Sequence, residues 1–162
     1  RRLRSGVSPP QGPPPDARDW VAEIDRWTER FRTLEGPPPV FARALRDGWD
    51  DGEREILAIE AAEYARTTAA YVEQLRTAGV DLVRLDCRLG TCGVCAKYDG
   101  KAYSLLDETP DLPPPPPLPI CPACRHTLNM LTPFFMQRTG VEPEDLVADA
   151  QPFDEDDLPR PG

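Results

Sequence analysis

The stretch DCRLGTCGVCAKYDG, residues 86–100, places three cysteines within nine positions. A second pair of cysteines follows in CPACRH, residues 121–126, together with the only histidine of the chain. All five cysteines of this 162-residue sequence therefore lie between positions 87 and 124. Such clustering is unusual for ordinary buried thiols and predicts a site at which several sulfur atoms meet.

The spacing of these cysteines favours a zinc site. Cys92–Cys95 and Cys121–Cys124 are two C-x2-C pairs, and each such turn brings two sulfurs to one side of a tight knuckle. Two knuckles supply the four thiolates of a tetrahedral Zn²⁺ site. We expect these four cysteines to be the ligands, with His126 or Cys87 as substitutes. Zinc would contribute about 10–16 kcal/mol to folding, which a small sheet with little core needs.

An iron–sulfur cluster is an alternative to zinc. The spacing Cys87-x4-Cys92-x2-Cys95 is also that of plant-type [2Fe–2S] proteins, with Cys124 as the fourth ligand. CRLGTCGVCA, preceded by LRTAGVDL, resembles the cluster loop of plant-type ferredoxins. The β-grasp fold of those proteins has a hairpin ahead of its helix, whereas residues 40–70 here have a helical pattern. Disulfides are a third alternative, disfavoured by the odd number of cysteines and the absence of a visible signal peptide.

Proline and charge are unevenly distributed along a chain with 21 prolines and a net charge of −9. Residues 1–15 are proline-rich and basic at the tip, and we expect an extended arm. Residues 113–119 are a second proline-rich stretch, expected to be an extended linker. Residues 141–162 contain eight acidic residues and one arginine, which predicts an acidic tail. No basic stripe indicates duplex DNA binding, and no apolar run reaches the roughly 20 residues that span a bilayer.

Residues 16–79 have the periodicity of helices. After Asp16, a candidate N-cap, apolar residues recur at alternating +4 and +3 steps and predict one helix. The core face of this helix comprises Trp20, Ile24, Trp27, Phe31 and Leu34. A short second helix is expected to carry Phe41, Leu45 and Trp49 on one side.

A long amphipathic helix is predicted to follow. Asp50 and Glu53 fit a capping box at its start, and Gly79 fits the position after its end. Its predicted apolar face comprises Leu57, Ala61, Tyr64, Thr68, Tyr71, Leu75 and Ala78. Only two shorter helices precede it to cover this face. We therefore expect the face to be shared with a second copy of the chain or with another partner.

Residues 80–140 change to the alternating pattern of strands. VDLVRLD, residues 80–86, predicts a strand with Val80, Leu82 and Leu85 as its apolar positions. KAYSL, residues 101–105, and the end of CPACRHTLNML predict two more, with a last helical turn at residues 133–138. The expected fold class is α+β, in which N-terminal helices precede a small antiparallel sheet stapled by the pair of zinc knuckles.

A series of motifs continues on both sides of the cysteines, from Tyr64 to Phe135. In chain order these motifs are Arg66-Thr67, Ala78-Gly79-Val80, Cys92-Gly-Val-Cys95, Tyr98-Asp-Gly-Lys-Ala-Tyr103, Pro113–Pro119, and Cys121-Pro-Ala-Cys124-Arg-His126-Thr-Leu128. This series resembles the phage head morphogenesis proteins related to protein F of phage Mu. That family has His-Pro-x-Cys-Arg-Cys where this chain has Cys121 first and His126 last. Both exchanges are between metal ligands, and Cys87 has no counterpart in the family.

The resemblance implies a structural, non-enzymatic minor capsid protein of a tailed phage or phage-derived particle. It implies portal and capsid proteins as partners, packaged DNA as a further contact, and assembly in the bacterial cytoplasm into a virion or phage-like particle. Arg66 and Arg125 would be structural or portal-facing. A [2Fe–2S] electron-transfer protein is the second hypothesis and a zinc-ribbon interaction module the third. We predict no catalytic residue, because metal ligation accounts for His126 and four thiolates close a zinc site.

Overall fold

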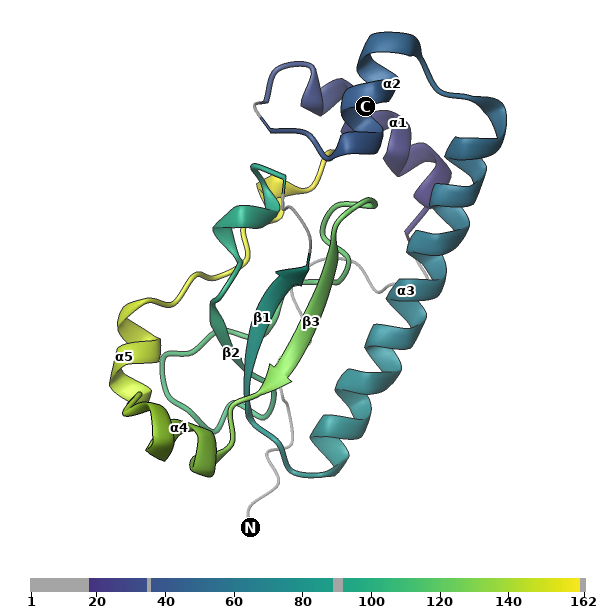
Figure 1. Ribbon diagram of the computed structural model, residues 1–162. Helices are drawn as coiled ribbons and strands as arrows, with labels where there is room; N and C mark the ends of the chain where they lie inside the picture. The colour runs from purple at the N-terminus through teal and green to yellow at the C-terminus, as the bar shows by residue number, and fades with distance from the viewer. Residues whose placement is uncertain (1–17, 35, 89–91, 161–162) are drawn as a thin grey trace.

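The computed structural model describes residues 18–34, 36–88 and 92–160 of the chain (Figure 1). It confirms the predicted α+β class, with helices packed beside a small antiparallel sheet. No helix in these ranges is both long and apolar enough to cross a membrane. The elements are α1 (Trp20–Phe31), α2 (Pro39–Asp47), α3 (Asp51–Thr77), β1 (Leu82–Arg88), η2 (Cys95–Lys97), β2 (Ala102–Ser104), β3 (Arg125–Met130), α4 (Pro133–Thr139), α5 (Pro143–Ala148) and η3 (Glu155–Asp157).

Helix α1 has the predicted core face but a different cap. Its N-cap is Asp19, whose side chain accepts a hydrogen bond from the Ala22 amide at 3.2 Å. Asp16, the predicted cap, lies outside the described residues, as does the arm expected at residues 1–15. Leu34 follows the end of the helix and is 37% exposed, so it does not belong to the core. The other four predicted positions are buried: Trp20, Ile24, Trp27 and Phe31.

Aromatic rings pack α1 against α2 and against Trp49, which lies just before α3. Phe41 of α2 lies between Phe31 and Trp49, with ring centroids 5.0 Å and 5.2 Å away. Trp27 extends this series at 5.3 Å from Phe31. The Trp49 indole donates a hydrogen bond to the Thr28 hydroxyl at 2.9 Å. Trp49 therefore contributes both apolar ring surface and a satisfied indole N–H to this end of the molecule.

The ends of α3 follow the local sequence signals. Asp50 and Glu53 form the predicted capping box. At the other end Gly79 has φ 82°, and the Val80 amide donates to the Leu75 carbonyl at 2.9 Å. This bond, with the Gly79 amide on the Arg76 carbonyl at 3.0 Å, makes a Schellman motif.

The buried face of α3 overlaps the predicted apolar face only in part. Leu57, Ala61 and Leu75 are buried as predicted. Ala58 and Ala65 are buried in addition, whereas Tyr71 and Ala78, both on the predicted apolar face, are exposed. Small side chains allow α1 to pack closely on the first half of α3, and the helix then continues past this contact (Figure 1). The long face predicted to need a partner is thus covered within the chain over its first half.

The sheet has the order β2-β1-β3, with both pairings antiparallel. In β1, Val83 and Leu85 are fully buried, whereas Leu82 is only partly buried. The predicted strand is present, but of its predicted apolar positions Leu85 faces the main core and Leu82 does not. Leu82 packs instead against a second, smaller cluster formed by Ala102, Leu112 and Leu131. Because both faces of β1 are covered, the alternation in its sequence does not identify the main core.

The two segments expected to be extended pack against the domain. Residues 115–120 are all buried. Prolines have no N–H to leave unpaired, and Arg18 donates to the carbonyls of Pro119 and Ile120 at 2.6 Å and 3.1 Å. In the acidic segment, Phe153 and Asp157 are buried. Residues 141–160 are thus a structural part of the domain, because a buried ring and a paired carboxylate anchor them.

Candidate metal centre

Four cysteines meet beside the end of the sheet. The Sγ atoms of Cys92, Cys95, Cys121 and Cys124 all lie within 4.8 Å of one another, and all four residues are buried. In the first pair Cys95 begins η2 and Cys92 lies three residues before it, and the second pair directly precedes β3. The structure thus brings the four predicted residues into one group that could hold a metal ion.

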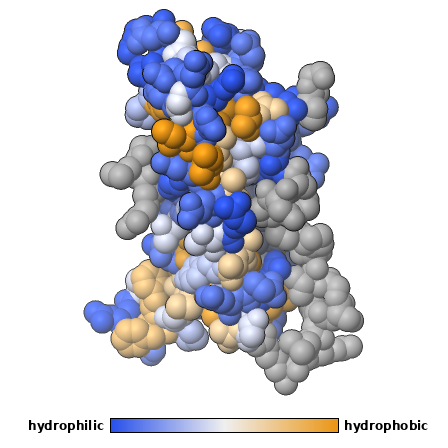
Figure 2. All heavy atoms as spheres, turned by 90° about the vertical axis from the view of Figure 1, so that its right-hand side faces the viewer, coloured by the Kyte–Doolittle hydropathy of each residue, from blue (hydrophilic) through white to orange (hydrophobic). Residues whose placement is uncertain are grey.

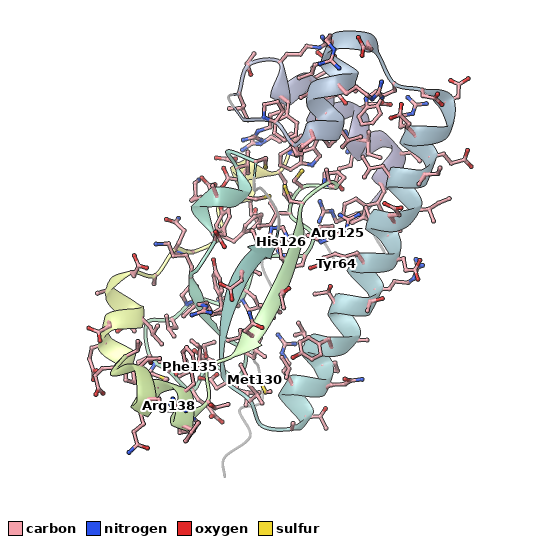
Figure 3. The ribbon with its side chains drawn as sticks, in the orientation of Figure 1. Tyr64, Arg125, His126, Met130, Phe135 and Arg138 are labelled. Carbon is pink, nitrogen blue, oxygen red and sulfur yellow. The ribbon has the colours of Figure 1, made fainter. Side chains whose placement is uncertain are left out.

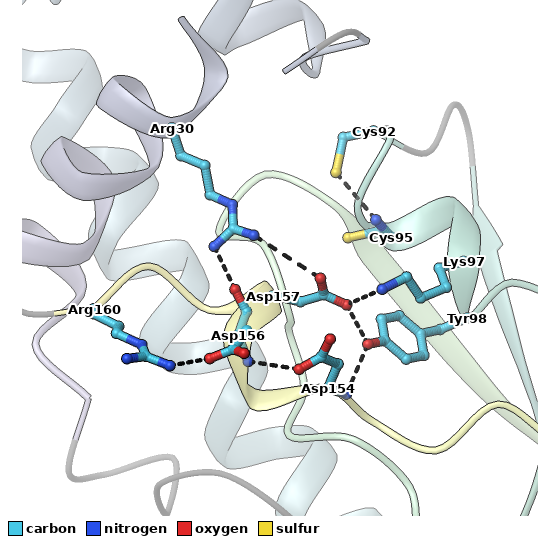
Figure 4. A network of polar contacts seen from close by, with 9 residues as sticks. All are labelled: Arg30, Cys92, Cys95, Lys97, Tyr98, Asp154, Asp156, Asp157 and Arg160. Atoms are coloured by element: carbon cyan, nitrogen blue, oxygen red, sulfur yellow. Dashed lines mark hydrogen bonds and ion pairs between the residues drawn. The ribbon is translucent and has the colours of Figure 1, made fainter. Parts of the chain in front are cut away.

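The first pair has the backbone geometry of a metal knuckle. The Cys95 amide points at the Cys92 sulfur, with an N–Sγ distance of 3.4 Å (Figure 4). The Ala96 amide donates to the Cys92 carbonyl at 3.0 Å, which closes the turn. The Gly93 amide donates to the Gly36 carbonyl at 3.1 Å, so the knuckle rests on the loop after α1.

The second pair is fixed by a side chain from the following strand. The Cys124 amide donates to the Cys121 carbonyl at 3.3 Å and closes the turn. The Arg125 guanidinium donates to the carbonyls of Pro122 and Cys124 at 2.5 Å and 3.3 Å. Its centre also lies 5.2 Å from the centroid of the Tyr64 ring. The Arg125 side chain is therefore held by contacts with the second cysteine pair and with Tyr64.

Helix α3 is attached to the centre through Tyr64. The Tyr64 hydroxyl donates to the His126 carbonyl and accepts from the His126 amide, the latter at 2.8 Å. Tyr64 and Arg125 lie between α3 and β3, close to His126 on β3 (Figure 3). The helical pattern placed Tyr64 on the inner face, but nothing local in the sequence indicated its partner.

Burial and the neighbouring thiols shift the pKa values of the cysteines in this group. Hydrogen bonds from the neighbouring thiols, chiefly that of Cys121, hold the pKa of Cys92 well below its usual range. Burial, the largest effect at Cys121, raises the pKa of that thiol. Four thiolates cannot ionise together in such a buried site without a cation to offset their charge.

The donor set fits a metal ion. Zn–S bonds of about 2.3 Å in a tetrahedron require sulfurs about 3.8 Å apart, which is within the separation found here. A divalent cation would take the place of the thiol protons and would neutralise part of the charge of the four thiolates. The four cysteines can therefore act as the ligands of one ion.

The two substitute ligands lie outside this group. Cys87 and His126 are cross-strand partners in β1 and β3. His126 is only 4% exposed, burial lowers its pKa to about 4, and neither ring nitrogen has a hydrogen-bond partner in the described part of the chain. Burial, with a contribution from Asp99, raises the pKa of Cys87 to about 12. Both side chains are thus neutral neighbours of the four-sulfur group.

A network that the sequence did not indicate joins the acidic segment to the first knuckle (Figure 4). The Asp157 carboxylate accepts from the Lys97 ammonium at 2.8 Å and from the Tyr98 hydroxyl. The Arg30 guanidinium of α1 lies 3.9 Å from the same carboxylate. In the sequence Asp157 belongs to a run of acidic residues that is typical of a solvated surface. Only the fold shows that Asp157 is buried while the acidic residues before it are exposed.

A cavity of about 660 Å³ lies at the opposite end of the sheet, around the end of β3 and the start of α4. Among the described residues, its charged lining residues are Asp81 and Glu142. Asp81 accepts hydrogen bonds from the Ser104 and Thr109 hydroxyls at 2.5 Å and 2.8 Å, and Glu142 belongs to the capping box of α5. Both carboxylates are therefore used structurally.

Fold and site together define an α+β domain whose buried four-cysteine centre can hold a metal ion. Comparisons with protein-family models, curated proteins and solved structures find no match to this chain. The likeness to phage head morphogenesis proteins thus remains a prediction from the quoted motifs.

Proposed function

We propose that this protein is a structural, non-enzymatic component of a tailed-phage head or phage-derived particle, and that a zinc ion stabilises its cysteine region. The observation that supports the metal site is the group of four buried sulfurs within 4.8 Å of one another. Four protein ligands leave no open position on zinc for substrate or water, which is typical of a structural site.

The arrangement of the sulfurs favours one zinc ion over a [2Fe–2S] cluster. In a cluster two irons are bridged by sulfides, so ligands on different irons lie farther apart than ligands on one ion. The plant-type spacing also requires Cys87, which is absent from the four-sulfur group. The helices α2 and α3 occupy the region where a ferredoxin has its first hairpin.

The role in particle assembly rests on the motif series and is compatible with the surface of the domain. Of the two arginines in those motifs, Arg125 is bound to carbonyls of the centre. Arg66 is exposed on α3 and has no ion-pair partner among the residues that the structure describes. We assign Arg125 a structural role and Arg66 a role in contacts with portal, capsid or packaged DNA.

Metal analysis of the purified full chain tests the first part of the proposal. We expect a colourless protein with about one zinc per chain and no acid-labile sulfide. A brown protein containing iron and sulfide would replace zinc with a cluster. Rubredoxin-like iron would be coloured without sulfide, so the two measurements separate all three cases.

Particle incorporation tests the second part. The tagged chain is produced in the cells that encode it, and particles are isolated on a density gradient and analysed by mass spectrometry. We expect the chain in head fractions and a strong loss of incorporation for Arg66→Glu, while Arg46→Glu, a matched exposed arginine on α2, is incorporated normally. Absence of the chain from every particle fraction would contradict the assembly role while leaving the zinc site standing.

A further inference from the structure

The outer face of α3 carries a regular stripe that is exposed throughout. Its positions alternate by +4 and +3, as in the seam of a helix pair. The most apolar members, Ile56 and Ile59, are 57% and 58% exposed. Figure 2 looks onto this side of the molecule and shows a hydrophobic area in its upper half. The stripe consists of Gly52, Ile56, Ile59, Glu63, Arg66, Ala70, Glu73 and Thr77.

The stripe is symmetric about its midpoint, which falls between residues 64 and 65. If two copies of α3 run antiparallel with this midpoint on a two-fold axis, every position of the stripe faces another position of the stripe. Ile59 then faces the partner's Ala70, and Ile56 faces the aliphatic stem of the partner's Glu73. A large residue meets a small or flexible one at each contact, so two helices can approach closely.

The charges of the stripe are complementary in the same arrangement. Glu63 faces the partner's Arg66, and by symmetry this pair occurs twice. Neither residue has an ion-pair partner within the described ranges of its own chain. In a parallel arrangement each would face its own copy, with repulsion between like charges.

The shape of the face also fits a second copy. A shallow hollow of about 530 Å³ lies on the C-terminal half of α3, whereas the exposed isoleucines project from the N-terminal half. Antiparallel pairing places the isoleucines of each copy over the hollow of the other. The hollow is lined by Ala70, Glu73, Gln74, Thr77 and Ala78.

We propose that the outer face of α3 is an antiparallel dimer interface between two copies of this chain. The inference goes beyond the proposed function and uses no metal ligand. Arg66 is the one residue that both proposals use, and the double variant E63R/R66E, which is expected to keep the dimer while position 66 stays reversed toward a phage partner, separates the two roles. A helix of 27 residues is about 40 Å long, and one such helix pair is at the small end of specific interfaces. We therefore expect dissociation in the micromolar range.

Sedimentation equilibrium of the full chain over a range of concentrations measures this equilibrium. Because of the two-fold symmetry the contact of Ile59 with the partner's Ala70 occurs twice. Ile59→Glu removes both copies of this contact and is expected to weaken the dimer on the order of a hundredfold. Glu63→Arg and Arg66→Glu each turn two ion pairs into repulsive contacts and are expected to weaken it on the order of tenfold. An equimolar mixture of the two single variants restores opposite charges and is expected to form a heterodimer. The double variant E63R/R66E is expected to recover the original affinity.

Val21→Glu is the matched control, because Val21 is 47% exposed on α1 and lies outside the stripe. It is expected to leave the dimer unchanged, and far-UV circular dichroism checks that each variant remains folded. A chain that stays monomeric at all concentrations would overturn the proposal. A dimer insensitive to Ile59→Glu would do the same, as would a charge-reversal pair without recovery on mixing.

Discussion

The helical segment, residues 18–79, and the cysteine region, residues 82–131, reach stability by different physical routes. The helical segment has a long capped helix and aromatic rings packed 5.0–5.3 Å apart. The cysteine region has strands of seven, three and six residues, and four of its buried side chains are cysteines. Both regions bury apolar side chains, but only the second brings four thiols together, and a metal ion bound by them would contribute to its folding.

The two regions are nevertheless parts of one core. Buried residues from α1, α3, β1 and both knuckles form a single continuous cluster. The polar contacts of Tyr64 with β3 and of Asp157 with η2 and α1 join the regions at two points. A change in one region therefore affects the other through identifiable contacts, and four predictions test this.

The largest expected effect is loss of the metal centre. Cys121→Ser, or chelation of the metal, should remove much of the about 10–16 kcal/mol that a structural zinc supplies. Hydrogen exchange followed by mass spectrometry should show lost protection in β1, β2 and β3, with α1 and α3 protected longer. Cys87→Ser is the control and should keep both the metal content and the exchange pattern. Equal protection in wild type and Cys121→Ser would contradict the contrast between the regions.

Next in size is truncation in the aromatic core. Trp27→Ala should lower the free energy of unfolding by about 3–5 kcal/mol, because a fully buried indole leaves a cavity. Urea denaturation measures this loss, and metal content should remain at about one ion per chain in the folded protein. Val21→Ala, an exposed position on the same helix, should change stability by less than about 0.5 kcal/mol. If Trp27→Ala released the metal from a protein that stays folded, metal binding in the cysteine region would depend directly on packing in the aromatic core, contrary to this prediction.

A smaller effect is expected at the link between the acidic segment and the knuckle. Asp157→Ala leaves Lys97 and Tyr98 without their acceptor and should cost about 1–3 kcal/mol. Limited proteolysis should then cleave residues 141–160 faster than in the wild type. Asp149→Ala breaks an exposed ion pair with Lys101 and should be nearly neutral. Similar proteolysis rates for both variants would mean that Asp157 does not anchor the segment.

The smallest expected effect is at the contact between α3 and β3. Tyr64→Phe removes the hydroxyl that bridges the His126 amide and carbonyl and should cost about 0.5–1.5 kcal/mol. Thermal unfolding measures the loss, and Tyr71→Phe on the exposed part of the same helix is the matched control. If the two variants were equally stable, the attachment of α3 to the centre would depend on packing alone.

Local signals account for what the sequence predicted correctly. The capping box at Asp50 and Glu53, the glycine stop at Gly79 and the two C-x2-C pairs each act over a few residues. Their geometry is fixed by nearby backbone, so the surrounding fold has little influence on them. This is why both ends of α3 and the four sulfurs could be named from the sequence.

The sequence by itself determined the α+β class, the three N-terminal helices and the four cysteines that meet, because periodicity and knuckle spacing are properties of neighbouring residues. Helix α5, in the segment predicted to be an acidic tail, was not among the predicted elements. Only the tertiary structure decided that Val83 rather than Leu82 faces the main core, and that Cys87 and His126 stay outside the sulfur group. It also decided that Asp157 is buried, because the partner of its carboxylate is Lys97, 60 residues earlier in the chain. Contacts over such distances depend on how elements are placed together, and no local pattern encodes that placement.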